Sequence, residues 1–135
     1  MDEGVPSSIK EQIRAMNEKS LDYLRDIREN PDDFIAVSKN IKAFVLHRFF
    51  LVEDNPDTDG IAELSKLSIE KLLEVNKRGM LQDLSNNCAG VSSETMKKAL
   101  LIMTLQKQLG VVFDPMKNDT VSQLAQSVVE QLGSS

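Results

Sequence analysis

The side chains best suited to chemistry stand close together in the last third of the chain, in the sequence G-V-S-S-E-T at residues 90–95. Ser92 and Ser93 open a stretch whose apolar residues recur at helical spacing, so either hydroxyl can lie at a helix N-terminus. Backbone N–H groups and the positive end of the helix dipole favour a phosphodiester at such a position. Serine is also an ordinary N-cap residue, which uses its hydroxyl only to accept a backbone hydrogen bond. The pattern therefore predicts either an attachment site for a phosphate group or a simple helix start.

The other reactive side chains lack partners in the sequence. Cys88 is the only cysteine and His47 the only histidine, so the chain has neither an internal disulfide nor a Cys/His cluster for zinc. A lone cysteine more often packs as a small apolar group, and no serine–carboxylate pattern accompanies His47. The chain also lacks a G-x-x-x-x-G-K or G-x-G-x-x-G motif. We therefore expect a protein that is not an enzyme and binds no metal.

Composition argues against several classes of partner. The 21 acidic residues outnumber the 16 basic residues and give a formal net charge of -5, whereas phosphate neutralisation in nucleic-acid binding needs clustered lysine and arginine. No run approaches the roughly 18 apolar residues that a membrane span requires, and the first residues are acidic where a signal peptide would be basic. We expect a cytoplasmic protein that binds neither nucleic acid nor membranes.

The elements that must position the serines are helices. Apolar periodicity predicts an all-α bundle of about five helices and no convincing strand. The low content of glycine and proline, 6 and 4 residues, and the absence of tryptophan also favour helix over sheet. The expected helices span approximately residues 9–30, 34–52 and 61–81, then from 92 or 93 to 109, and from 119 or 120 to 132.

An acidic, turn-rich stretch at residues 53–60 is the best internal boundary. It divides the chain into an N-terminal helical extension of two helices, residues 1–57, and a second helical part, residues 58–135. The second helix has a broad apolar face from Phe34 to Val52, which predicts that it is the most buried element of the first part. The six methionines stand at helical spacing and are expected to fill the core.

The order of motifs in residues 58–135 resembles the acyl and peptidyl carrier proteins. After the serine pair and its long helix, L-G-V-V-F at residues 109–113 stands where carriers leave that helix. The sequence D-T-V-S-Q-L-A at residues 119–125 stands where carriers begin their T-V-x-x-L-A final helix. The resemblance implies an acyl-carrier-like bundle in which a serine at the start of the second long helix is esterified by 4'-phosphopantetheine.

Two alignments with the carrier family place the attachment residue differently. The family sequence G-x-D-S-L matches residues 90–94 with Ser93 at the attachment position, but this chain departs from it at the aspartate and leucine positions. Counting back from Leu109, matched to the apolar residue that closes the family helix, puts Thr95 there instead. Ser93 keeps the nucleophile and is the preferred site, with Ser92 and Thr95 as alternatives. A third possibility is a carrier-related protein that has lost the prosthetic group.

The resemblance implies a carrier that presents a phosphopantetheine-tethered acyl or aminoacyl group in fatty-acid, polyketide or peptide biosynthesis. Its partners would be a phosphopantetheinyl transferase and the acyl- or peptide-processing enzymes. The alternative is a carrier-related helical module for protein–protein interaction without the group. Carriers are strongly acidic along the second helix, whereas this chain has Lys97, Lys98 and Lys107 there, which implies a different docking partner.

Overall fold

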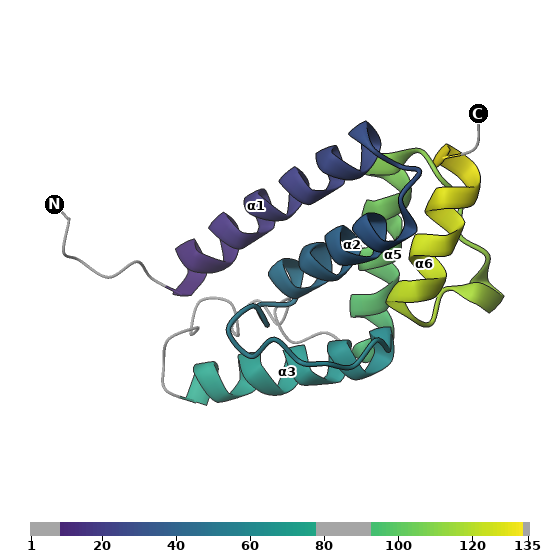
Figure 1. The fold of residues 1–135 in the computed structure, drawn as a ribbon. Helices are drawn as coiled ribbons and strands as arrows, with labels where there is room; N and C mark the ends of the chain where they lie inside the picture. The colour runs from purple at the N-terminus through teal and green to yellow at the C-terminus, as the bar shows by residue number, and fades with distance from the viewer. Residues whose placement is uncertain (1–8, 78–92, 134–135) are drawn as a thin grey trace, which may run out of the picture.

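The computed structural model describes residues 9–77 and 93–133 of the chain, which form a bundle of helices (Figure 1). This part of the chain contains five α-helices and no strand, so the expected all-α bundle is confirmed. A 3-10 turn, η1, precedes the last helix, and a π-helical turn, η2, follows it. The elements are α1 (Ile9–Glu29), α2 (Phe34–Arg48), α3 (Ile61–Lys77), α5 (Glu94–Leu109), η1 (Pro115–Lys117), α6 (Val121–Val128) and η2 (Val129–Gly133).

The first two helices form an antiparallel pair. Figure 1 shows α2 returning alongside α1 after a short loop. Asp33 begins α2, because its Oδ1 accepts hydrogen bonds from the backbone N–H groups of Ile35 and Ala36 at 3.1 and 3.2 Å. An aspartate at this position also places negative charge at the positive end of the helix dipole. The helix start predicted from the sequence is therefore confirmed.

The predicted end of α2 is wrong. The apolar pattern continues to Val52, but the helix ends at Arg48 and Phe50 adopts a left-handed backbone conformation with φ 59°. The chain turns there, and the N–H of Leu51 donates to the carbonyl oxygen of Leu46 at 2.8 Å. Leu51 is only 2% exposed, so the residues after the turn enter the core as the helix does. An apolar pattern cannot distinguish a helix from a turn that buries the same kind of side chain.

A two-residue bridge joins the starts of α3 and α6. The N–H of Ile61 donates to the carbonyl oxygen of Asp119 at 2.8 Å, and the N–H of Val121 donates to the carbonyl oxygen of Asp59 at 2.9 Å. The Asp59 carboxylate also accepts from the N–H of Ser122 at 3.2 Å. These bonds tie the loop that ends near residue 60 to the last helix. They pair backbone groups that a helix N-terminus otherwise leaves without a partner.

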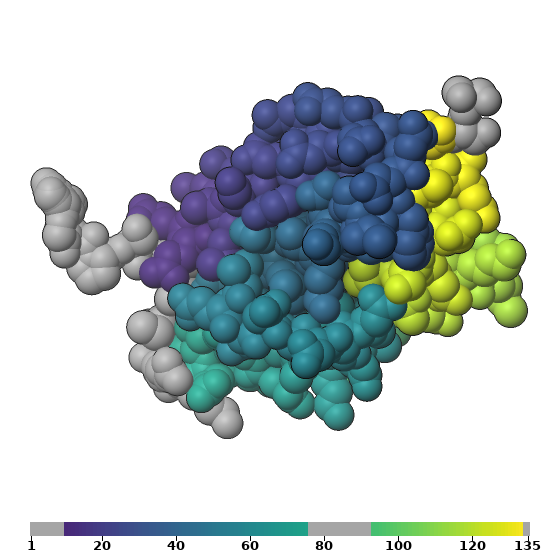
Figure 2. Space-filling model, viewed as in Figure 1, coloured from purple at the N-terminus to yellow at the C-terminus, as the bar shows by residue number. Residues whose placement is uncertain are grey.

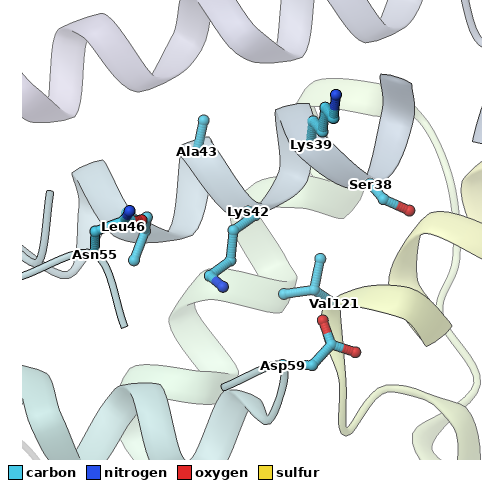
Figure 3. A pocket seen from close by; sticks show the side chains of 8 residues that line it. All are labelled: Ser38, Lys39, Lys42, Ala43, Leu46, Asn55, Asp59 and Val121. Atoms are coloured by element: carbon cyan, nitrogen blue, oxygen red, sulfur yellow. The ribbon is translucent and has the colours of Figure 1, made fainter. Parts of the chain in front are cut away.

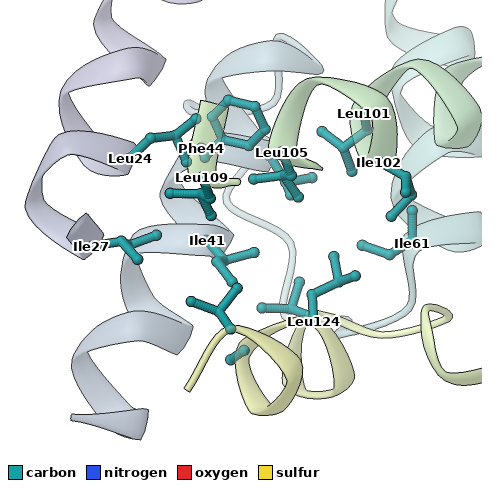
Figure 4. Packing of buried hydrophobic residues seen from close by; sticks show 14 of the residues in the cluster. Leu24, Ile27, Ile41, Phe44, Ile61, Leu101, Ile102, Leu105, Leu109 and Leu124 are labelled. Atoms are coloured by element: carbon teal, nitrogen blue, oxygen red, sulfur yellow. The ribbon is translucent and has the colours of Figure 1, made fainter. Parts of the chain in front are cut away.

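A single large hydrophobic core is built from all five α-helices, and Figure 4 shows side chains from these helices meeting in it. The expected boundary at residue 57 falls in the loop between α2 and α3. Both parts of the chain contribute to the same core: α2 packs against α6, and α1 contacts α5. Its largest buried side chains include Leu24, Ile27, Ile41, Phe44, Ile61, Leu64, Leu105 and Leu124.

The surface view agrees with this packing. In Figure 2 the purple and blue surface of α1 and α2 lies above the teal surface of residues 49–77 and beside the yellow surface of α6. The high burial predicted for α2 is confirmed, with Val37, Ile41, Phe44 and Val45 fully buried. Phe34 differs, because it is the first residue of α2 and is 39% exposed. Within the described part of the chain, no helix combines the length and the apolar character needed to cross a membrane.

Candidate functional site

Ser93, the preferred attachment residue, is the N-cap of α5. Its backbone is extended, with φ -65° and ψ 162°, and its side chain is exposed. The hydroxyl Oγ accepts a hydrogen bond from the N–H of Met96 at 3.1 Å. The helix therefore begins where the serine pattern predicted, and the hydroxyl faces solvent while it caps the helix.

The alternative attachment residues differ in what the structure describes. Thr95 lies in the first turn of α5 with an exposed side chain, next to the exposed Glu94. Ser93 and Thr95 are thus both accessible at the same end of one helix. Ser92 lies outside the described residues, as does Cys88.

The far end of α5 is held in place by two residues, Gly110 and Arg28. Gly110 ends the helix in the left-handed conformation, with φ 72°, and its N–H donates to the carbonyl oxygen of Gln106 at 2.9 Å. Arg28 of α1 donates from Nη1 to the carbonyl oxygen of Gln108 at 2.7 Å. A glycine stop and a cation at the carbonyl end both stabilise a helix C-terminus. The helix end predicted at Leu109 and Gly110 is therefore confirmed.

The Val111 to Phe113 triplet is extended but forms no sheet. Val111 and Phe113 are buried, whereas Val112 points outward and is 74% exposed. Side-chain amides replace a partner strand: Gln131 bonds both the N–H and the carbonyl oxygen of Val112, at 3.0 and 2.7 Å. This segment therefore anchors the loop between α5 and α6 to the core.

The motif at residues 119–125 begins α6 with a capping box. Thr120 Oγ1 accepts from the N–H of Gln123 at 3.0 Å, and Gln123 Oε1 accepts from the N–H of Thr120 at 3.1 Å. Val121 and Leu124, the next residues of the motif, are buried in the core. The helix start predicted at this motif is therefore confirmed, and Thr120 serves as its N-cap.

The outward side of α5 carries a row of exposed apolar side chains, although the methionines in it were expected to lie in the core. Met96, Leu100 and Met103 are 50%, 52% and 60% exposed. The core-facing side of the same helix is formed by Leu101, Leu105 and other buried residues, so the row lies on the opposite face. A shallow hollow of about 480 Å³ lies over this face, lined by Leu100, Met103, Thr104, Gln106 and Lys107.

The helical spacing of the methionines did not show which side of α5 they occupy, because this helix has apolar residues on both faces. Met116 of η1 is also exposed, at 82%. The expectation that the methionines fill the core is therefore wrong for these exposed ones. Counting apolar residues around α5 would have revealed a second apolar face.

The three lysines of α5 have different surroundings. Lys97 is half-buried, with its Nζ 5.1 Å from the centroid of the Phe49 ring, and burial lowers its pKa. Lys98 forms an ion pair with Asp119 at 2.6 Å. Lys107 is exposed and lines the hollow on the outward face. From the sequence we expected no difference between these three lysines, because their neighbours in space cannot be read from it.

A second hollow lies between α2 and α6, away from the predicted residues. It measures about 390 Å³ and includes the buried hydroxyl of Ser38, which has no hydrogen-bond partner among the described residues. Lys42 donates to the carbonyl oxygen of Thr58 at 3.1 Å, and Figure 3 shows the side chain of Lys39 pointing away from that of Lys42. The lining residues are Ser38, Lys39, Lys42, Ala43, Leu46, Asn55, Asp59 and Val121. No motif in the sequence identified this hollow.

His47 has structural contacts. Its Nδ1 lies 2.8 Å from the carbonyl oxygen of Ala43, and its ring centroid lies 5.0 Å from that of Tyr23. Among the described residues no group of three or more His, Cys, Asp or Glu side chains could hold a metal ion. The described groups with the clearest functional potential therefore lie at the two ends of α5 and on its outward face.

The chain matches no protein-family model, no curated protein and no solved structure. Two features of this chain could support a function: the exposed hydroxyl groups at the start of α5 and the apolar row that follows them on the same helix.

Proposed function

We propose that the protein is an acyl or peptidyl carrier-like protein of the cytoplasm. It would present a phosphopantetheine-tethered acyl or aminoacyl group to partner enzymes of fatty-acid, polyketide or peptide natural-product biosynthesis. The single observation that carries this proposal is the exposed hydroxyl of Ser93 at the N-cap of α5. A transferase can reach a nucleophile there without unfolding any part of the bundle.

The surroundings of Ser93 are compatible with 4'-phosphopantetheine. The exposed side chain leaves room for a long arm, and the N-terminus of α5 places backbone N–H groups and a positive partial charge near a phosphodiester. The attached group would supply a terminal thiol that holds the cargo as a thioester. Glu94 opposes a second negative charge at this end, so the backbone groups of α5 must supply most of the attraction.

The loading step requires one nucleophile from this chain. Ser93 Oγ would form a bond to the coenzyme A phosphorus that carries the pantetheine arm. The bond from that phosphorus to the adenosine bisphosphate would break and release it, and the hydroxyl proton would pass to a base of the transferase. Later steps require this chain to hold and present the cargo, while the partner enzymes carry out the chemistry.

A second candidate function is favoured by a different observation. The hydrogen bond from the N–H of Met96 to Ser93 Oγ gives the serine a complete structural role as a cap. Together with the exposed apolar row on α5, this supports a carrier-related interaction module that lacks the prosthetic group.

The test is the intact mass of the folded protein after incubation with coenzyme A and a broad-specificity phosphopantetheinyl transferase. The most informative variant is Ser93→Asp, which keeps an N-cap acceptor but has no hydroxyl to esterify. Thr95→Ala and Ser92→Ala test the alternative sites. Ser122→Ala is the matched control, because Ser122 is an exposed serine in the first turn of α6.

The proposal predicts one added arm in the wild type, in Thr95→Ala, in Ser92→Ala and in Ser122→Ala, and none in Ser93→Asp. Circular dichroism of each variant shows whether the bundle is folded. No addition to the folded wild type would favour the interaction module. Loss of the arm only in Thr95→Ala or Ser92→Ala would move the attachment residue.

A further inference from the structure

The outward face of α5 has the composition of a binding surface. Met96, Leu100 and Met103 follow one another at intervals of four and three residues, which places them in one row along a helix. Each is at least 50% exposed, while Leu101 and Leu105 on the opposite face are buried. The row from residue 96 to residue 103 is about 10 Å long, which is two helical turns. Contiguous exposed apolar side chains of this kind mark interaction sites more often than single ones do.

The charges around this row are basic although the chain as a whole is acidic. Residues 95–113 contain three lysines and no acidic residue, in a chain of 21 acids and 16 bases. Lys98 is paired with Asp119. Lys107 extends the row by one further turn, and Lys97 lies on its flank over the Phe49 ring. Neither Lys97 nor Lys107 forms an ion pair with another residue in the described part of the chain.

We propose that the outward face of α5 binds an acidic amphipathic helix of a partner protein. A partner helix would place two or three apolar side chains against Met96, Leu100 and Met103, and carboxylates beside Lys97 and Lys107. Apolar anchors supply affinity in such helix-to-groove contacts, and the complementary charges set the orientation and exclude other partners. A basic partner is disfavoured, because no carboxylate lies within residues 95–113 to receive it.

This inference goes beyond the proposed carrier function and does not depend on it. The surface consists of side chains of α5 other than Ser93, so binding would occur whether or not Ser93 is modified. An anionic membrane is the other surface that a basic and apolar helix face attracts. The apolar row is only about 10 Å long and the opposite face of α5 is buried in the core, so the row fits one partner helix better than a membrane surface.

The experiment uses the full chain and a display library of helical peptides. Every peptide has the same leucine row at intervals of three and four, and its flanking positions vary freely among Glu, Lys and Gln. Because the protein is acidic overall, non-specific attraction would enrich lysine. We expect the selected peptides to carry Glu beside the leucine row instead. Affinities of purified peptides are then measured by fluorescence anisotropy.

Three variants locate the binding surface. Leu100→Glu and Lys107→Glu should each weaken binding of the Glu-rich peptides by about tenfold or more, because they place a like charge beside the peptide carboxylates. Ile35→Glu is the matched control, since Ile35 is 65% exposed on α2, and it should leave the affinity unchanged. Melting curves of the three variants check that each is folded.

Several results would overturn the proposal. These are a library that yields no binder, enrichment of Lys or Gln, and equal binding to wild type and Leu100→Glu. Binding of the wild type to anionic lipid vesicles that is lost in Leu100→Glu would assign the face to a membrane. Self-association of the protein that is lost in the same variant would assign it to a second copy of this chain.

Discussion

At the scale of single residues, Ser93 combines two properties. Its hydroxyl caps α5 by accepting the N–H of Met96, and it is exposed to solvent. The first property is needed for the fold and the second for any attachment. Substitutions that keep one property and remove the other therefore separate the structural role of Ser93 from its proposed function.

The structural role gives a first prediction. Ser93→Ala should lower the free energy of unfolding by about 1 kcal/mol, because the N–H of Met96 loses its side-chain acceptor. Ser93→Asp should stay close to the wild type, since its carboxylate can accept the same bond. Urea denaturation of the three proteins measures these differences. Equal losses in both variants would contradict the cap as the source of the stabilisation.

Lys97 gives a second prediction, on pH dependence. Burial lowers its pKa from 10.5, so the folded protein binds this proton less tightly than the unfolded chain does. Between the lowered pKa and 10.5 the unfolded chain holds more protons, and the free energy of unfolding therefore rises with pH in that window. At all pH values below the lowered pKa, Lys97 is charged in both states, and burial of its ammonium group lowers the free energy of unfolding by a constant amount.

Lys97→Met should therefore stabilise the protein at neutral pH and remove part of the rise as the pH approaches 10.5. Urea denaturation at several values of pH measures this slope. Lys107→Met, at an exposed position on the same helix, should keep the slope of the wild type. A Lys97→Met protein with an unchanged slope would show that this lysine is not the group responsible.

At the scale of elements, helix starts were predictable and one helix end was not. Ser93 and Thr120 begin α5 and α6 through bonds to residues three positions away, so the signal lies within a few neighbouring residues. The end of α2 depends on the left-handed Phe50 and on the burial of Leu51 against other helices. That information is tertiary, and no local pattern contains it.

The candidate site was predictable to a similar extent. The sequence placed Ser93 correctly at a helix start, because capping is local. It did not identify the outward apolar row, because all methionines were expected to fill the core, whereas Met96 and Met103 lie on the outward side of α5. The neighbours of Lys97 and Lys98 were equally hidden, since Phe49 and Asp119 are distant in the sequence.

The end of α5 gives a third prediction. Gly110 has φ 72°, and a Cβ added there would meet no atom within 4 Å. Gly110→Ala should therefore lower the free energy of unfolding by about 1 kcal/mol through backbone strain alone. Gly110→Asn should cost less, because asparagine tolerates this conformation better. Thermal denaturation measures both, and a larger loss for Asn than for Ala would contradict strain as the cause.

At the scale of the whole molecule, the first two helices and the rest of the chain share one core. Ile41 and Phe44 of α2 are fully buried in the same cluster as Leu105 of α5 and Leu124 of α6. The loop at residues 53–60 therefore separates sequence segments that are packed together. The N–H groups of Val121 and Ser122 in α6 donate to oxygens of Asp59 and so tie the end of this loop to the last helix.

This shared core gives a fourth prediction. Residues 58–135 expressed alone should show little cooperative thermal unfolding, because α2 no longer covers α6. In the full chain, Phe44→Ala should lower the free energy of unfolding by roughly 3–5 kcal/mol, as truncation of a buried phenylalanine does. Calorimetry of the full chain should show one transition. A sharp transition in the 58–135 fragment would instead show that this part folds independently.

The measurement that tests the carrier proposal most directly is fragmentation mass spectrometry of the protein loaded from coenzyme A by the transferase. It reads which residue bears the arm, and so tests the chemistry and the position together. The account predicts a single phosphopantetheine on Ser93, the exposed N-cap of α5. An unmodified chain, or an arm on Ser92 or Thr95 with Ser93 unmodified, would contradict it.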